Sequence, residues 1–141
     1  MIKSFPYSIL ALASAALLLA GLAGAPAALA QEKIRWQPYD SGALAAKAEK
    51  KKLMIHFYAD WCAYCKKMEA ETFQNPKVVE ALNSRFVTVR VDSDRQKQIA
   101  GQFRVRGLPD TWFIGADGVP IGNRIGFISA DQLLKILRSL P

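Results

Sequence analysis

Two cysteines, Cys62 and Cys65, constrain this chain more than any other feature of its sequence. They follow a short apolar run, 53–58, that predicts a buried strand, and they open a stretch of good helix formers, 63–70. Unsatisfied backbone N–H groups and the positive end of the helix dipole favour a thiolate over a thiol at a helix start. Because the thiolate is the nucleophile in disulfide exchange, this placement predicts redox chemistry.

The two cysteines are predicted to have different roles because they occupy different positions in the helix. Cys62, at the helix start, is predicted to attack a substrate disulfide, and Cys65, one turn further in and more buried, to resolve the mixed disulfide. Two other interpretations are weaker. A structural disulfide across so small a loop adds little stability, and a zinc site needs three or four ligands, for which His56 is the only other Cys or His in the chain. We expect neither a metal nor a cofactor.

Residues 1–30 differ in kind from the rest of the 141-residue chain. They carry one charge, Lys3, then an apolar run over 9–23 and small residues at 28–30, which is the pattern of a cleaved signal peptide with Gln31 as the mature N-terminus. An uncleaved membrane anchor is the alternative, because 7–30 could supply the roughly 20 apolar residues of a spanning helix. The Gly and Pro residues at the end of the run favour cleavage.

The remaining 111 residues, 31–141, are predicted to form one periplasmic domain. Residues 1–30 hold one of the 19 Lys and Arg residues and none of the 12 Asp and Glu residues, so the domain has a net charge of +6. Its basic residues are not interleaved with aromatic ones, which argues against a nucleic-acid partner. We expect a monomer.

The domain alternates predicted strands and helices. Asp40 or Ser41 can cap the first helix, Asn75 followed by Pro76 marks the start of another, and Ser129 with Gln132 forms a capping box for the last. Asp117-Gly118 marks a hairpin turn. The order is β-α-β-α-α-β-α-β-β-α, an α/β fold with helices on both faces of a mixed sheet whose hairpin strands are antiparallel. The predicted segments are 33–36, 42–51, 53–58, 63–70, a helix from 76, 86–91, 96–103, 111–114, 120–125 and 130–139.

Several motifs together resemble the thioredoxin family, and within it the C-terminal periplasmic domain of the bacterial transmembrane thiol:disulfide interchange reductase. A Cys-x-x-Cys pair alone is weak evidence. A Cys-x-x-Cys pair at a strand–helix junction, together with a Gly-x-Pro before a hairpin strand, is a specific sign of the family. The likeness covers about residues 34–140 and implies a thioredoxin fold. The shared residues are Tyr58 to Cys62, Cys65 and Lys66, Thr72 and Phe73, Asn75 to Val78, Gly107 to Pro109, and Gly126 and Phe127.

The resemblance implies roles for three further residues, Pro109, Leu108 and Trp61, and a fourth residue, Tyr64, lies between the two cysteines. Pro109 matches the family's cis-proline, which packs against the cysteine pair, although an ordinary proline at a strand start is the alternative. Leu108 would offer backbone groups to an extended substrate segment. Trp61 matches the active-site tryptophan, with core packing as its other explanation, and Tyr64 is expected to be exposed where it can touch a partner protein.

Two departures from the family pattern affect the chemistry. His56 stands where relatives carry a buried Asp that moves protons for the second cysteine. It is a candidate proton acceptor, with a buried neutral histidine as the alternative. Arg90, on the next strand, would disfavour the imidazolium. Asp110 follows Pro109 where relatives often have Thr. A carboxylate near Cys62 would raise the pKa of the thiol, but we favour a solvated turn residue.

These observations predict an exported protein-disulfide reductase that receives electrons from a membrane thiol–disulfide donor and passes them to disulfides of other exported proteins. The resemblance, not the chemistry of the residues, supports the direction. A disulfide oxidase or isomerase is an alternative within the enzymes, and a redox-gated binding module that holds its target through Cys62 is a second. The physiological substrate, the donor and the reduction potential do not follow from the sequence.

Overall fold

The computed structural model describes residues 31–141, and the predicted signal peptide, 1–30, lies outside the described residues. In the described part, no helix is both apolar enough and long enough to cross a membrane. The strands and helices follow the predicted order. They are β1 (Trp36–Gln37), α1 (Tyr39–Glu49), β2 (Lys52–Tyr58), α2 (Ala63–Glu71), α3 (Pro76–Arg85), β3 (Phe86–Asp92), α4 (Lys97–Gln102), β4 (Asp110–Ile114), β5 (Pro120–Ile125) and α5 (Ala130–Ser139).

The five strands form one mixed sheet in the order β1-β3-β2-β4-β5. β1, β3 and β2 are parallel, whereas β4 runs antiparallel to β2, and β5 antiparallel to β4. The hairpin strands are therefore the antiparallel part, as predicted. Gly118 has φ 82° in the connection between them, and Asp117 accepts a hydrogen bond from the Val119 N–H at 3.0 Å. This positive φ suits a glycine because it has no Cβ.

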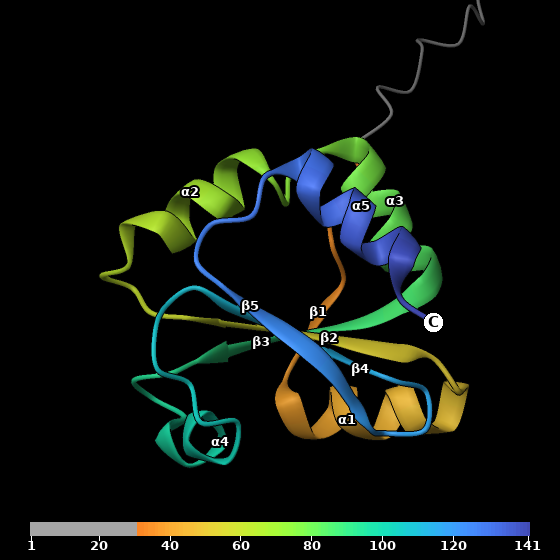
Figure 1. Ribbon diagram of the computed structural model, residues 1–141, viewed down its shortest axis with the longest axis horizontal. Helices are drawn as coiled ribbons and strands as arrows, with labels where there is room; N and C mark the ends of the chain where they lie inside the picture. The colour runs from red at the N-terminus through yellow and green to blue at the C-terminus, as the bar shows by residue number, and fades with distance from the viewer. Residues whose placement is uncertain (1–30) are drawn as a thin grey trace, which may run out of the picture. The chain divides into compact units, whose positions relative to one another are not determined.

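Helices cover both faces of the sheet, with α2, α3 and α5 on one side and α1 and α4 on the other (Figure 1). β2 lies in the middle and is buried on both faces. Its alternate side chains enter two different cores: Ile55 and Phe57 face α1 and α4, and Met54 faces the three-helix side. This sandwich is the predicted thioredoxin fold.

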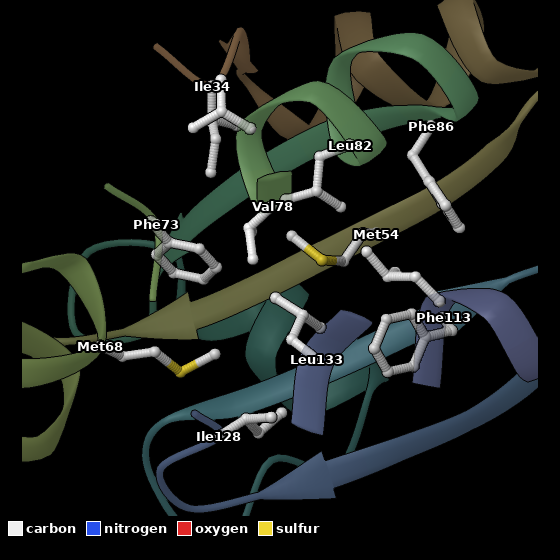
Figure 2. Close-up of a cluster of buried hydrophobic side chains, with 12 residues drawn as sticks. Ile34, Met54, Met68, Phe73, Val78, Leu82, Phe86, Phe113, Ile128 and Leu133 are labelled. Atoms are coloured by element: carbon white, nitrogen blue, oxygen red, sulfur yellow. The ribbon is translucent and has the colours of Figure 1, made fainter. Parts of the chain in front are cut away.

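The larger core lies between the sheet and the three-helix layer (Figure 2). Met54 and Phe113 reach it from the sheet, and Met68, Leu82 and Leu133 from the helices. Several of these side chains are fully buried, so the core holds α2 at a fixed place over the sheet. This packing also fixes the start of α2, where the cysteines lie, relative to the sheet.

The predicted helix starts are partly correct. Asn75 caps α3 by accepting from the N–H groups of Lys77 and Val78, and Ser129 with Gln132 forms the capping box of α5. For α1 the prediction is wrong: the helix begins at Tyr39, after Pro38, and no side chain caps it. Tyr39 packs edge-on against Phe103 at 5.9 Å between ring centroids, a tertiary contact that local capping rules do not include.

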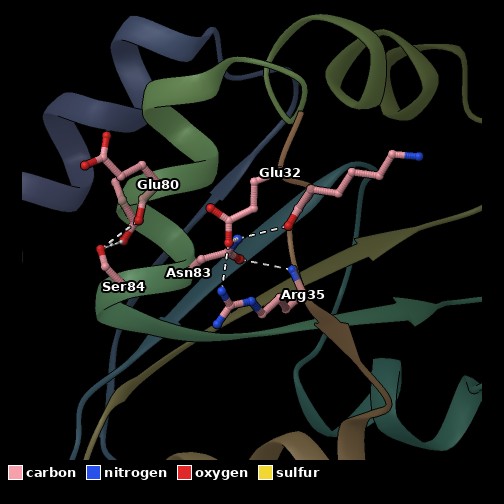
Figure 3. Close-up of polar contacts among 7 residues, drawn as sticks. Glu32, Arg35, Glu80, Asn83 and Ser84 are labelled. Atoms are coloured by element: carbon pink, nitrogen blue, oxygen red, sulfur yellow. Dashed lines mark hydrogen bonds and ion pairs between the residues drawn. The ribbon is translucent and has the colours of Figure 1, made fainter. Parts of the chain in front are cut away.

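The first strand also differs from the prediction, because β1 is only Trp36 and Gln37. The residues before it are held by Asn83 of α3 instead of by the sheet (Figure 3). Asn83 Nδ2 donates to Glu32 Oε1 at 3.0 Å and to the Lys33 carbonyl at 2.9 Å, and its Oδ1 accepts from the Arg35 N–H at 3.0 Å. Two of these three hydrogen bonds engage backbone groups that a longer strand would need, the Lys33 carbonyl and the Arg35 N–H.

Candidate active site

The cysteine pair lies where β2 ends and α2 begins. Cys62 is the N-cap residue of α2, and its Sγ accepts a hydrogen bond from the Cys65 N–H at 3.1 Å. The two residues form a disulfide with their Cα atoms 5.2 Å apart. Both side chains are buried, so Cys65 is hardly more enclosed than Cys62. The N-cap position brings N–H groups and the helix dipole to Cys62 Sγ, where a thiolate would form on reduction.

The loop that precedes β4 packs against the disulfide. The Leu108–Pro109 peptide bond is cis, the isomer that the resemblance implies. Leu108 packs against the small cluster formed by Ala59, Cys62 and Cys65, and Pro109 is buried at the start of β4. The Pro109 carbonyl accepts a hydrogen bond from the Gly126 N–H at 2.7 Å, which ties the loop to the end of β5.

Two aromatic side chains beside the disulfide are exposed. Trp61 is 70% exposed and Tyr64 is 63% exposed, although large aromatic side chains are usually well buried. The Trp61 indole N–H donates to Asp94 Oδ2 at 2.9 Å, which fixes the ring against the β3–α4 connection. Core packing therefore does not explain Trp61, whose exposed indole forms one edge of the surface around the disulfide.

A groove of about 420 Å³ runs from Trp61 along α4 to the loop that precedes Pro109. Ala100, Val105 and Leu108 give it an apolar lining, and the cations Lys97 and Arg106 also line it. Sequence reasoning missed this groove. The only signal was a concentration of basic residues between 95 and 106, which without the fold could not be assigned to any surface.

His56 is fully buried on β2, on the same face of the sheet as Met54. Its ring packs edge-on against Phe73 at 4.9 Å, and its Nδ1 lies 3.3 Å from the Thr111 hydroxyl on β4. Burial, and secondly the charge of Arg90, lowers the pKa of His56 from 6.5 to about 3, so the imidazole is neutral. Within residues 31–141, Nε2 has no hydrogen-bond partner and neither ring nitrogen is hydrogen-bonded to a cysteine.

Tyr58 connects His56 to the cysteines. Its ring stacks in parallel with the His56 ring at 6.4 Å, and its side chain packs against the cysteine cluster. Arg90 lies over the Tyr58 ring at 4.2 Å and pairs with Glu69 of α2. A partly buried cation is thus held close to His56, and its positive charge disfavours the imidazolium.

The prediction that Asp110 is a solvated turn residue is wrong. Asp110 is a buried residue of β4. Its carboxylate accepts hydrogen bonds from Trp112 Nε1 at 3.0 Å and Asn123 Nδ2 at 2.9 Å. Burial raises the pKa of Asp110, and the two hydrogen bonds oppose that change. The carboxylate is thus engaged by two neutral donors in the sheet.

Within residues 31–141 the side chains do not form a candidate metal site. In the part of the chain from 31 to 141, no three side chains among His, Cys, Asp and Glu come together as a set of ligands. The disulfide, the exposed aromatic residues and the groove are the chemical features of this face.

Comparisons with known proteins agree on the family. The profile of a family described as a thioredoxin-like domain matches residues 39–141. The thiol:disulfide interchange protein DsbD of Photorhabdus laumondii is 33% identical over 111 residues, which cover 75% of this chain and 19% of that protein. DsbD of Vibrio vulnificus is 36% identical over 101 residues, 67% of this chain and 17% of that protein. The chain thus spans about a fifth of the length of these curated relatives.

Solved structures give the same result. A thioredoxin from Thermus thermophilus superposes with a TM-score of 0.69 at 29% identity, covering 76% of this chain and 86% of that one. The C-terminal domain of Neisseria meningitidis DsbD in its oxidised form superposes with a TM-score of 0.60 at 27% identity, covering 70% of this chain and 89% of that domain.

Proposed function

The chain belongs to the thioredoxin-like family of thiol–disulfide oxidoreductases, and on that premise we propose that it is an exported protein-disulfide reductase. The observation that carries the proposal is the Cys62–Cys65 disulfide at the N-terminus of α2, packed against Leu108 and opening beside a groove. A structural staple would not need an exposed indole and a substrate-sized groove next to it. The names of the interchange-protein relatives support exchange between proteins.

The proposed cycle uses two thiols and moves two electrons. The Cys62 thiolate attacks one sulfur of the substrate disulfide, that S–S bond breaks, and the released substrate thiolate takes a proton. Cys65 then loses its proton and attacks Cys62 Sγ in the mixed disulfide, which releases the second substrate thiol. The protein is left with the Cys62–Cys65 disulfide seen in the structure. A dithiol donor, which we place in the membrane, reduces it by the same steps in reverse.

The surface around the disulfide would hold the substrate. Trp61 and Tyr64 present exposed aromatic faces, which bury large areas with little loss of side-chain entropy. Leu108, before cis-Pro109, would pair through its backbone with an extended segment of the substrate. Such pairing would align the substrate disulfide with Cys62 Sγ.

His56 enters the proposal as the acceptor of the Cys65 proton. Its imidazole is neutral and its Nε2 is without a partner within residues 31–141, so a lone pair or a proton on this atom is uncommitted. Because neither nitrogen is hydrogen-bonded to a cysteine, transfer would pass through a water molecule. A pKa of about 3 makes His56 a weak proton acceptor at neutral pH, which counts against this role and favours the alternative of a buried neutral histidine.

We place the protein in the periplasm as a monomer, with residues 1–30 removed as a signal peptide. The residues of that segment support the proposal through their single charge, apolar run and small residues before Gln31. Substrates would be other exported proteins that carry disulfides. Mass spectrometry of the protein recovered from the periplasmic fraction tests this directly, since cleavage predicts an N-terminus at Gln31.

The reduction potential of the Cys62–Cys65 pair tests the direction of the reaction. Residues 31–141 would be equilibrated in graded thiol buffers, and the free thiols would be trapped and counted. A reductase should show a potential near or below the roughly −200 to −270 mV of glutaredoxins and thioredoxin. A value near the roughly −120 mV of a strong oxidant would instead make the protein a donor of disulfides.

Single cysteine variants separate an enzyme from a binding module. Turnover of a protein disulfide requires both thiols, so Cys62→Ser and Cys65→Ser should each abolish it. Cys65→Ser should also trap the substrate as a mixed disulfide on Cys62, whereas Cys62→Ser should not. A binding module that holds its target through Cys62 should keep its association in Cys65→Ser and show no turnover even in the wild type, and that result would contradict the proposal.

A further inference from the structure

We propose that the groove beside the disulfide selects acidic, extended segments of substrate proteins, with Lys97 and Arg106 as the residues that set this preference. The proposal deepens the proposed function and rests on it, because it names the chemical class of segment that the reductase accepts. The groove joins Trp61 to the loop before Pro109, so a segment lying in it would run alongside the disulfide.

The two cations of the groove are not neutralised by the protein. Lys97 and Arg106 are exposed, and within residues 31–141 neither forms an ion pair. Arg95, by contrast, contacts two carboxylates close by, Asp60 at 3.4 Å and Asp92 at 3.3 Å. The chain therefore pairs one cation of this region and leaves the two that line the groove available to a ligand.

The acidic groups near the groove are already engaged. Asp94 accepts the Trp61 indole N–H, and Asp60 pairs with Arg95. On the other side of the disulfide, Lys66 and Lys67 follow Cys65 along α2 and are exposed. Asp94 keeps its negative charge, because a neutral indole N–H does not cancel it. Lys97 and Arg106 at the groove and Lys66 and Lys67 across the disulfide nevertheless give this face several cations that form no ion pair within residues 31–141, and these would attract carboxylates and repel lysine and arginine.

The groove also fits an extended backbone. Val105 and Leu108 give it an apolar lining, and Ile125, which is 60% exposed, lies at its border, where its Cγ2 would be 3.0 Å from a Cβ at Gly107. Within residues 31–141, the backbone N–H groups of Gly107 and Leu108 donate to no backbone carbonyl. Those groups are available to a strand-like segment, while the cations act on its side chains.

The expected selectivity is modest because the cations are exposed. Exposed ion pairs contribute little individually, and two of them correspond to a preference of roughly 2- to 30-fold for an acidic segment over a neutral one. Salt screens such pairs, so the preference should decline as the ionic strength rises.

Three disulfide-bonded peptides test the proposal. They share one cysteine-containing segment and differ only in flanks of Asp and Glu, of Ser, or of Lys and Arg. The rate constant for their reduction by reduced residues 31–141 should follow the order acidic, neutral, basic at low ionic strength. In the double variant Lys97→Gln and Arg106→Gln, the ratio of acidic to basic rates should approach one. The double variant Lys135→Gln and Arg138→Gln on α5, with the same loss of two charges outside the groove, should keep the wild-type ratio.

The outcomes separate this inference from the proposed function. Equal rates for acidic and basic peptides, with all peptides reduced, would overturn the inference and leave the reductase standing. An equal loss of selectivity in the double variant Lys135→Gln and Arg138→Gln would assign the preference to net charge and also overturn it. If no peptide is reduced, the proposed function fails. Binding of the same peptides with serine in place of cysteine, followed by Trp61 fluorescence on the oxidised protein, then still decides whether the groove prefers acidic segments.

Discussion

Replacing His56 with leucine should remove a specific part of the pH dependence of stability. His56 is fully buried, and burial and the Arg90 charge lower its pKa from 6.5 to about 3 in the folded protein. The unfolded chain exposes the imidazole and protonates it at its ordinary pKa. Between these two values the unfolded state binds a proton that the folded state excludes, so the wild type loses stability as the pH falls.

The size of the effect follows from the two pKa values. Each pH unit in this window corresponds to about 1.36 kcal/mol, because a proton binds to only one of the two states. Between pH 7.5 and pH 4.5 the wild type should therefore lose about 2.7 kcal/mol through His56 alone. The contribution of His56 is fully present above pH 6.5 and is lost progressively down to about pH 3.

Urea unfolding of the oxidised wild type and of His56→Leu, at several pH values from 7.5 to about 4.5, measures the effect. The difference between the two free energies of unfolding cancels the carboxylates that both proteins share. It also turns any packing defect of leucine into a constant offset. We expect the difference, wild type minus variant, to fall by about 2.7 kcal/mol across the window. A difference that stays constant with pH would show that the folded protein protonates His56 as readily as the unfolded chain does, and would refute the reasoning.

Three further predictions follow from the packing and the hydrogen bonds. Leu133→Ala empties a fully buried position in the larger core and should lower the free energy of unfolding by about 2–5 kcal/mol, whereas Leu44→Ala, at a position 71% exposed, should change it by less than about 0.5 kcal/mol. Urea unfolding compares the two, and equal losses would contradict the assigned core. Asn83→Ala removes three hydrogen bonds to residues 32–35 and should cost about 1–3 kcal/mol, while Ser84→Ala, whose hydroxyl bonds only within α3, should cost less; hydrogen exchange near Arg35 should rise only in the first variant. Burial raises the pKa of Asp110 above 3.8, so the folded state retains a proton that the unfolded chain releases, and the wild type loses stability as the pH rises above this value. Asp110→Asn should therefore gain stability relative to the wild type between about pH 4 and pH 7, and a relative loss over that range would contradict the direction of the pKa change.

The order of elements and the chemistry of the junction were predictable because they depend on neighbours along the chain. An apolar run followed by Cys62 and helix formers specifies a strand, a cap and a helix within a few residues. Asn75 and Ser129 mark helix starts for the same reason, since a cap bonds to N–H groups two or three positions away. The thioredoxin fold was predictable because the Cys-x-x-Cys and Gly-x-Pro motifs occur together in the right order.

Features that depend on distant contacts were missed or misjudged. α1 begins at Tyr39, which packs against Phe103 at the end of α4, and Asn83 of α3 holds the residues before the short β1. Asp110 is polar, which suggests solvent, yet Trp112 and Asn123 supply the donors that allow it to be buried. In each case the deciding partner lies on another element, and local propensity carries no information about it.

The sequence by itself determined that this protein has a close cysteine pair at a helix start in an α/β domain, because capping, periodicity and motif spacing are local properties. Only the tertiary structure decided what surrounds that pair. It brings Trp61, Lys97 and Arg106 onto one groove and places His56 one aromatic ring away from the cysteines, since each of these neighbourhoods is made by segments that meet only when the sheet is assembled.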